Sequence, residues 1–87
     1  MSGRVALVTG GSRGIGKAIA KALIRDGCRV VIADVDQESL ASCEAELNTD
    51  GNVKAVCGDV TSHDDVAAAV KSCVETFGNL HILVNNA

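Results

Sequence analysis

Short apolar runs alternate with amphipathic stretches along the whole of this 87-residue chain. The apolar runs lie at residues 4–9, 29–35, 53–57 and 81–84. The first is unbroken from Val5 to Val8, which is typical of a strand covered on both faces. Because a stretch of helical character separates each run from the next, the pattern predicts parallel strands joined by helical crossovers, and therefore an α/β fold.

The stretches between the runs repeat apolar residues at helical spacing. We expect helices at residues 14–26, at residues 37–48, and from just after Ser62 as far as Gly78. Gly27 is placed to end the first helix, and Ser62 with Asp65 three residues on predicts an N-terminal cap for the third. The faces expected to pack on the sheet carry, helix by helix, Ile15, Ile19, Ala22 and Leu23; Leu40, Cys43 and Leu47; and Val66, Val70, Cys73, Val74 and Phe77.

A glycine-rich segment at residues 9–16, Thr-Gly-Gly-Ser-Arg-Gly-Ile-Gly, connects the first strand to the first helix. Glycines are common in turns for conformational reasons alone, so the position at a strand-to-helix junction is what gives the segment its weight. Gly10 would permit a tight turn, Gly14 the close approach of a ligand, and Gly16 close packing of the helix on the strand. Unpaired amides at the start of the helix would then meet the negative charge of a pyrophosphate.

Two other nucleotide-binding sites share parts of this pattern. Residues 11–17 fit the first seven positions of the phosphate loop G-x-x-x-x-G-K-[ST], but Ala18 lacks the hydroxyl that the eighth position needs for Mg²⁺. A methyltransferase also has glycines after its first strand and an acid after its second. Its glycines usually lie closer together, as G-x-G. In this chain three residues separate Gly10 from Gly14, so the methyltransferase is disfavoured as well.

Asp34 ends the second apolar run, 18 residues after Gly16. A carboxylate at this position can accept hydrogen bonds from both ribose hydroxyls of an adenosine and would repel a 2′-phosphate. Arg13 opposes this preference, because a cation beside the glycines could pair with the 2′-phosphate. We expect the carboxylate to prevail, so the predicted cofactor is NAD, with NADP less favoured.

Two later strand ends carry further candidates. Asp59 could accept a hydrogen bond from the adenine amine while Val60 contacts the ring, although an aspartate ahead of a helix also forms turns. Asn85 and Asn86 follow the fourth run, where side-chain amides could brace neighbouring strands or contact the cofactor. The sequence leaves both possibilities open for each asparagine.

Composition narrows the partners that the chain can have. Apolar residues make up 47% and charged residues 22%, a balance typical of a globular domain, and no apolar run approaches the roughly 20 residues that cross a bilayer. The first residues do not resemble a secretory leader, so we expect a cytoplasmic protein without membrane contact. A net charge of −3 and a single aromatic residue, Phe77, disfavour a nucleic-acid surface.

The cysteines and histidines do not form a metal-binding pattern. Four cysteines lie 14 to 16 residues apart without a C-x-x-C pair, so we expect each to be a small buried apolar side chain and predict no metal site. The four are Cys28, Cys43, Cys57 and Cys73. His63 and His81 are each isolated, and we assign neither a catalytic role.

In combination, the glycine segment, Asp34, Asp59-Val60 and the segment at residues 85–87 resemble the short-chain dehydrogenase/reductase family over the whole chain. The resemblance implies a Rossmann-type fold and an NAD-dependent oxidoreductase that interconverts an alcohol and a ketone by hydride transfer. With Gly14 and Gly16, the cofactor-binding positions that it implies are Gly10, Ser12, Arg13, Ile15, Asp34, Asp59, Val60 and Asn86.

Family chemistry relies on a later serine and on a Tyr-x-x-x-Lys pair, whereas this chain contains no tyrosine. We therefore expect residues 1–87 to form the cofactor-binding portion alone, with no catalytic residue and no activity of its own. The small-molecule substrate would meet later segments, through which the family often forms dimers or tetramers. The alternative is a non-catalytic dinucleotide-binding or interaction module.

The resemblance also implies the arrangement of the strands. With four parallel strands in the order 3-2-1-4, right-handed crossovers would place the first two helices on one face of the sheet and the third on the other. This is an incomplete doubly wound fold, in which one face is only partly covered and the fourth strand is a bare edge.

Overall fold

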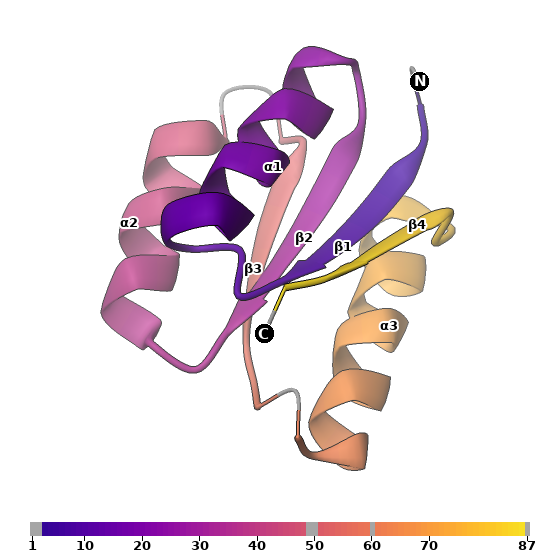
Figure 1. Ribbon diagram of the computed structural model, residues 1–87. Coiled ribbons are helices and arrows are strands. Elements are labelled where there is room, and N and C mark those ends of the chain that lie inside the picture. Colours follow the sequence, from indigo (N-terminus) through magenta and orange to yellow (C-terminus); the bar gives the residue numbers. More distant parts are fainter. Residues whose placement is uncertain (1–2, 49–50, 60, 87) are drawn as a thin grey trace.

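The computed structural model describes residues 3–48, 51–59 and 61–86. Its elements, in chain order, are β1 (Val5–Thr9), α1 (Gly14–Arg25), β2 (Arg29–Asp34), α2 (Gln37–Leu47), β3 (Val53–Cys57), α3 (His63–Phe77) and β4 (Ile82–Asn85). The strands form one parallel sheet in the order β3-β2-β1-β4 (Figure 1), which confirms the predicted fold and strand order. The predicted element bounds agree with these to within one residue. In particular, β4 begins at Ile82 and includes Asn85.

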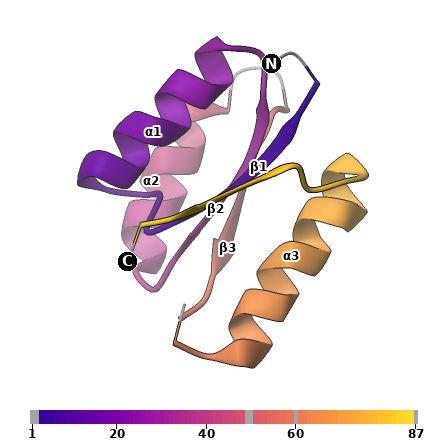
Figure 2. The ribbon, with the colours of Figure 1, turned by 45° about the vertical axis from the view of Figure 1, so that its right-hand side comes forward.

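Alternate side chains of the two central strands point to opposite faces of the sheet. From β1, Ala6 and Val8 pack with α1 and α2, whereas Val5 and Leu7 pack with α3. Figures 1 and 2 show α1 and α2 together on one side of the sheet and α3 on the other, as right-handed crossovers require. All five residues of β1 are buried, which is why this strand is apolar from Val5 to Val8.

The predicted face of α1 is correct for Leu23 and wrong for Ile15 and Ala22, which are exposed. Gly16 and Ala20 are buried, and Leu23 and Ile24 pack against the same core, whereas Ile15 is 72% exposed. The reason is steric, because Gly16 lies directly against the backbone of the glycine turn. The smallest side chains therefore face inward, and the apolar pattern alone misassigns the face.

The end of α1 agrees with the prediction. Gly27 has a left-handed φ of 90°, and its amide donates to the carbonyl of Ile24, while the amide of Cys28 donates to the carbonyl of Leu23. These two bonds pair carbonyls in the last turn of the helix, as expected where a glycine ends it.

The predicted face of α3 is correct for Cys73, Val70 and Phe77 and wrong for Val74. Val74 is 49% exposed, and Ala69 takes the buried position instead. The side chain of Ser62 accepts from the amide of Asp65, which is the predicted cap. The carboxylate of Asp65 does not complete a reciprocal box, since it accepts from the amide of Asp59.

The side of the sheet that carries α3 is the more open one. Within the described ranges, β4 lies at an edge of the sheet and its Leu83 is 58% exposed, in line with the expected bare edge.

Three of the four cysteines are buried as predicted: Cys28, Cys43 and Cys73. The fourth, Cys57, is exposed because it ends the other edge strand, β3. The prediction for Cys57 was therefore wrong.

Contact with a membrane core or a metal ion would require particular features among the described residues. No helix among them has the length and apolar character needed to cross a bilayer. The same part of the chain holds no group of three or more histidine, cysteine, aspartate or glutamate side chains that could surround a metal ion.

Candidate functional site

An open cleft lies where the strands reach their carboxyl ends. Its volume is about 340 Å³, within the range of small-molecule sites. In a parallel sheet, such a crevice is where ligands bind, at the point between β1 and β4 where the strand order reverses. The lining residues are Gly10, Arg13, Asp34, Val35, Gly58, Asp59 and Asn86.

The first glycine of the turn can be no other residue. Gly10 has a φ of 63°, and a Cβ atom there would overlap the backbone carbonyl oxygen of Asn86. Its amide donates to the carbonyl of Ala33 at 2.7 Å, which ties the turn to β2. A Cβ atom on Gly16 would overlap the carbonyl of Gly10 and approach the Asn86 amide nitrogen to 2.8 Å. Gly16 therefore packs against the turn itself, rather than on a strand as predicted.

Gly14 leaves space for a ligand, and the start of α1 offers it hydrogen-bond donors. Gly14 has a φ of 54°, and no atom lies within 4 Å of the place where its Cβ would be. Arg13, the N-cap residue, makes no side-chain hydrogen bond to the first turn of α1, whereas Asp36 and Ser62 cap α2 and α3 in this way. An uncapped helix start exposes backbone donors and a partial positive charge, so this end of α1 suits an anion such as a pyrophosphate.

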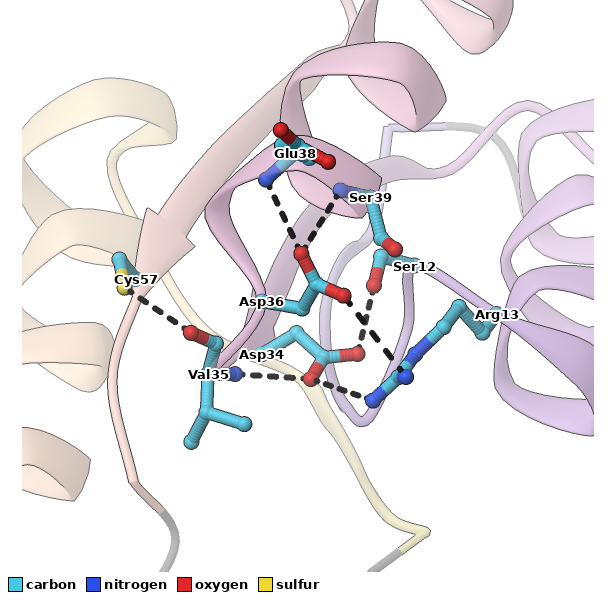
Figure 3. A network of polar contacts seen from close by, with 8 residues as sticks. All are labelled: Ser12, Arg13, Asp34, Val35, Asp36, Glu38, Ser39 and Cys57. Carbon is cyan, nitrogen blue, oxygen red and sulfur yellow. Dashed lines mark hydrogen bonds and ion pairs between the residues drawn. The ribbon is translucent and has the colours of Figure 1, made fainter.

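Asp34 is buried, with 7% of the residue exposed, and lies beside the glycine turn. One carboxylate oxygen accepts from the Ser12 hydroxyl at 2.6 Å, and the other accepts from the amide of Val35 at 2.7 Å (Figure 3). Burial alone would raise the pKa of Asp34, but these hydrogen bonds and the nearby Arg13 lower it below its ordinary value of 3.8. The side chain is therefore a fixed carboxylate at the edge of the cleft.

The guanidinium of Arg13 faces two carboxylates, those of Asp34 and Asp36 (Figure 3). One guanidinium nitrogen is 3.5 Å from an Asp34 oxygen, and the other is 3.8 Å from an Asp36 oxygen. Asp36 also has a lowered pKa, chiefly because the amide of Ser39 donates to it and to a smaller extent because of Arg13. Asp34 and Asp36 are therefore both ionised at neutral pH, and the positive charge of Arg13 is already paired with them.

Thr9 joins the ends of β1 and β4. Its hydroxyl lies within donating distance of the carbonyl of Val84 at 3.3 Å and the side-chain oxygen of Asn85 at 3.2 Å, and it accepts from the amide of Asn86 at 3.0 Å. Asn85 therefore braces the strands, and Asn86 lines the cleft and lies against Gly10.

Asp59 has a structural role as well as a place at the cleft. One of its carboxylate oxygens accepts from the amide of Thr61 at 2.8 Å and from the Thr61 hydroxyl at 2.7 Å. These bonds, the backbone one first, lower the pKa of Asp59. The turn-forming interpretation therefore holds, while the proposed contact with adenine stays a prediction. Val60 lies outside the described residues.

Several residues at the site were not singled out from the sequence. Gly11 has no room for a side chain, since its Cβ would come within 2.9 Å of the Ile32 side chain and of the Val8 carbonyl. Val35 lines the cleft although it is exposed and apolar. Asp36 could have been recognised as an aspartate immediately before a helix, where capping residues occur. Its contact with Arg13 depends on the tertiary fold and has no sequence signal.

The sheet, its crossovers and a glycine bend opposite an acidic strand end define a Rossmann-type protein. The chain belongs to the short chain dehydrogenase family, whose family model matches residues 4–87. Momilactone A synthase of Oryza sativa subsp. japonica is 47% identical over 85 residues, which cover 98% of this chain and 31% of that protein. Fluoren-9-ol dehydrogenase of Terrabacter is 40% identical over 87 residues, covering 100% of this chain and 24% of that protein.

Solved structures agree with this assignment. A short chain dehydrogenase from Bacillus anthracis matches with a TM-score of 0.91 and 36% identity, covering 98% of this chain and 35% of that one. A variant of actinorhodin polyketide ketoreductase with NADPH matches with a TM-score of 0.90 and 39% identity, covering 97% and 33%. The chain thus spans between about a quarter and a third of the length of these relatives.

Proposed function

We propose that the chain binds NAD(H) in the cleft and is the cofactor-binding part of a short-chain oxidoreductase that interconverts an alcohol and a ketone. The observation that carries this proposal is the buried Asp34 carboxylate, fixed at the end of β2 beside the glycine turn. Its position suits it to accept hydrogen bonds from the ribose hydroxyls of the adenosine half.

Each part of the cleft has a place in this proposal. The amides of residues 12–16 at the uncapped start of α1 bind the pyrophosphate, while Gly10 shapes the turn and donates its own amide to Ala33. The exposed Ile15 contacts the cofactor beyond the pyrophosphate. Ser12 and Arg13 fix the carboxylate of Asp34. The remaining positions, Asp59, Val60 and Asn86, contact the adenine and the nicotinamide side.

The choice of NAD over NADP is a proposal that rests on charge. The actinorhodin ketoreductase structure holds NADPH, so the side chains beside the ribose must decide the preference of this chain. Here two carboxylates, Asp34 and Asp36, flank the single cation Arg13. A 2′-phosphate would add negative charge beside a buried carboxylate, which is unfavourable unless it is fully compensated.

For the whole protein we propose a reaction in which the cofactor supplies the hydride chemistry and protein groups position the substrate and move a proton. The present chain contains no tyrosine, the proton donor that the family resemblance implies. We therefore propose that residues 1–87 bind the dinucleotide without turning it over.

A non-catalytic binding module is the second candidate. A native protein with a mass of only 8.9 kDa would favour the module, whereas a mass about three times larger would favour the enzyme.

Isothermal titration of the folded chain with NADH and with NADPH tests the binding. We expect saturable binding of both or of NADH alone, with NADH the tighter ligand. A sample that is folded by circular dichroism and binds neither dinucleotide would contradict the proposal.

The variant Asp34→Ala tests the choice of cofactor. Removal of the carboxylate should weaken NAD binding and improve NADP binding relative to it, because the ribose loses an acceptor and the 2′-phosphate loses a repulsive charge. Glu38→Ala is the matched control, since Glu38 is also acidic and lies in the first turn of α2, but its side chain takes no part in the Arg13 pairing. An unchanged preference in Asp34→Ala would show that other groups decide it.

A further inference from the structure

Asp36 uses its two carboxylate oxygens for two different purposes. One oxygen accepts from the amides of Glu38 and Ser39, at 3.1 and 3.2 Å, and so caps α2. The other oxygen points toward Arg13, whose nearest guanidinium nitrogen is 3.8 Å away (Figure 3). The helix cap thus fixes the carboxylate in an orientation that keeps its charge beside the cation.

The guanidinium of Arg13 is engaged on both of its terminal nitrogens. One faces Asp34 at 3.5 Å and the other faces Asp36 at 3.8 Å. A guanidinium binds a phosphate best when both nitrogens of its planar fork are available. A 2′-phosphate would therefore have to compete with these two carboxylates for Arg13.

We propose that Asp36 is a positioning residue for cofactor choice, which acts by holding Arg13 together with Asp34 and so withholding the guanidinium from a 2′-phosphate. The inference rests on the proposed binding of a dinucleotide in the cleft. The side chains of Arg13 and Asp36 are 60% and 40% exposed, so water and salt weaken their attraction. The expected effect is accordingly a modest bias added to the larger one of Asp34.

The variant Asp36→Asn separates the two functions of this side chain. Asparagine caps a helix about as well as aspartate does, so the hydrogen bonds to Glu38 and Ser39 can persist while the charge is lost. We expect the ratio of the NADP and NAD dissociation constants to move toward NADP by about two- to fivefold, the range of an exposed ion pair. Titration calorimetry with each dinucleotide, in competition with NADH where binding is weak, gives the ratio.

A double-mutant cycle with Arg13→Gln shows whether the effect passes through Arg13. In the Arg13→Gln background, Asp36→Asn should leave the ratio unchanged, because no cation remains to be released. Asp36→Ala provides a structural control, since it removes the cap and the charge together. Urea unfolding should show a loss of stability in Asp36→Ala and little or none in Asp36→Asn, while both variants shift the ratio alike.

The outcomes separate this inference from the proposed function. A ratio that shifts equally in the Arg13→Gln background would overturn the inference, because Asp36 would then repel the 2′-phosphate directly. An unchanged ratio in Asp36→Asn, with NAD still bound, overturns the inference and leaves the proposed function standing. A folded wild-type chain that binds neither dinucleotide overturns both.

Discussion

Replacing Gly16 with alanine tests how the glycine turn is held against α1. The added methyl group would overlap the Gly10 carbonyl and come within 2.8 Å of the Asn86 side-chain nitrogen. The first contact is with backbone, so α1 or the turn must move, and such overpacking costs about 1–3 kcal/mol. Alanine regains up to about 1 kcal/mol through its higher helix propensity. Because the clash is severe, we expect the upper part of this range and a net loss of about 1–2 kcal/mol.

Urea unfolding of the wild type and of Gly16→Ala measures this difference. The variant Ala18→Gly calibrates the propensity contribution, because it makes the reverse change at an exposed position of the same helix. A domain of this size has a total stability of about 4–13 kcal/mol, so Gly16→Ala should still fold and its dinucleotide binding can be measured. We expect that binding to weaken. A Gly16→Ala protein more stable than the wild type by the calibrated propensity difference would refute the contact between α1 and the turn.

Three further predictions follow from the surroundings of single side chains. The pKa of Asp34 is lowered in the folded state, so its contribution to stability is complete above its ordinary pKa of 3.8 and is lost as the pH falls below it. Between about pH 6 and pH 3, Asp34→Asn should therefore lose less unfolding free energy than the wild type, and an equal loss would contradict the lowered pKa. Ellman's reagent should label one thiol rapidly, that of Cys57, because the other three cysteines are buried; rapid labelling of Cys57→Ser would disprove this. Thr9→Val should cost about 1–3 kcal/mol by leaving the Asn86 amide without its acceptor, whereas Thr9→Ser should retain most of the stability.

The strands could be predicted because each is marked by a local run of apolar residues. Their order could be predicted because it is shared by the family that the sequence resembles. β1 is apolar without interruption from Val5 to Val8 and β2 from Val30 to Ala33, and Gly27 ends α1 through the bonds expected of a glycine in that position. Strand order followed from the family resemblance, and the handedness of parallel crossovers then placed the helices on their faces.

The helix faces and the side-chain network could not be predicted in the same way. The inward face of α1 depends on the close approach of Gly16 to the turn, a contact with no apolar signature. The exposure of Cys57 depends on β3 being an edge strand with few neighbours. The position of Arg13 between two carboxylates requires the turn, the end of β2 and the start of α2 to meet in space.

The most direct test of the proposed binding site is a titration of the ¹⁵N-labelled chain with NAD, followed by amide chemical shifts. Binding in the cleft should give progressive, saturable shifts at Gly10, at residues 12–16, at Asp34 and at Val35, with the amides of α3 little changed. Shifts confined to α3 or to the outer edge of β4, or none at all in a folded sample, would contradict it.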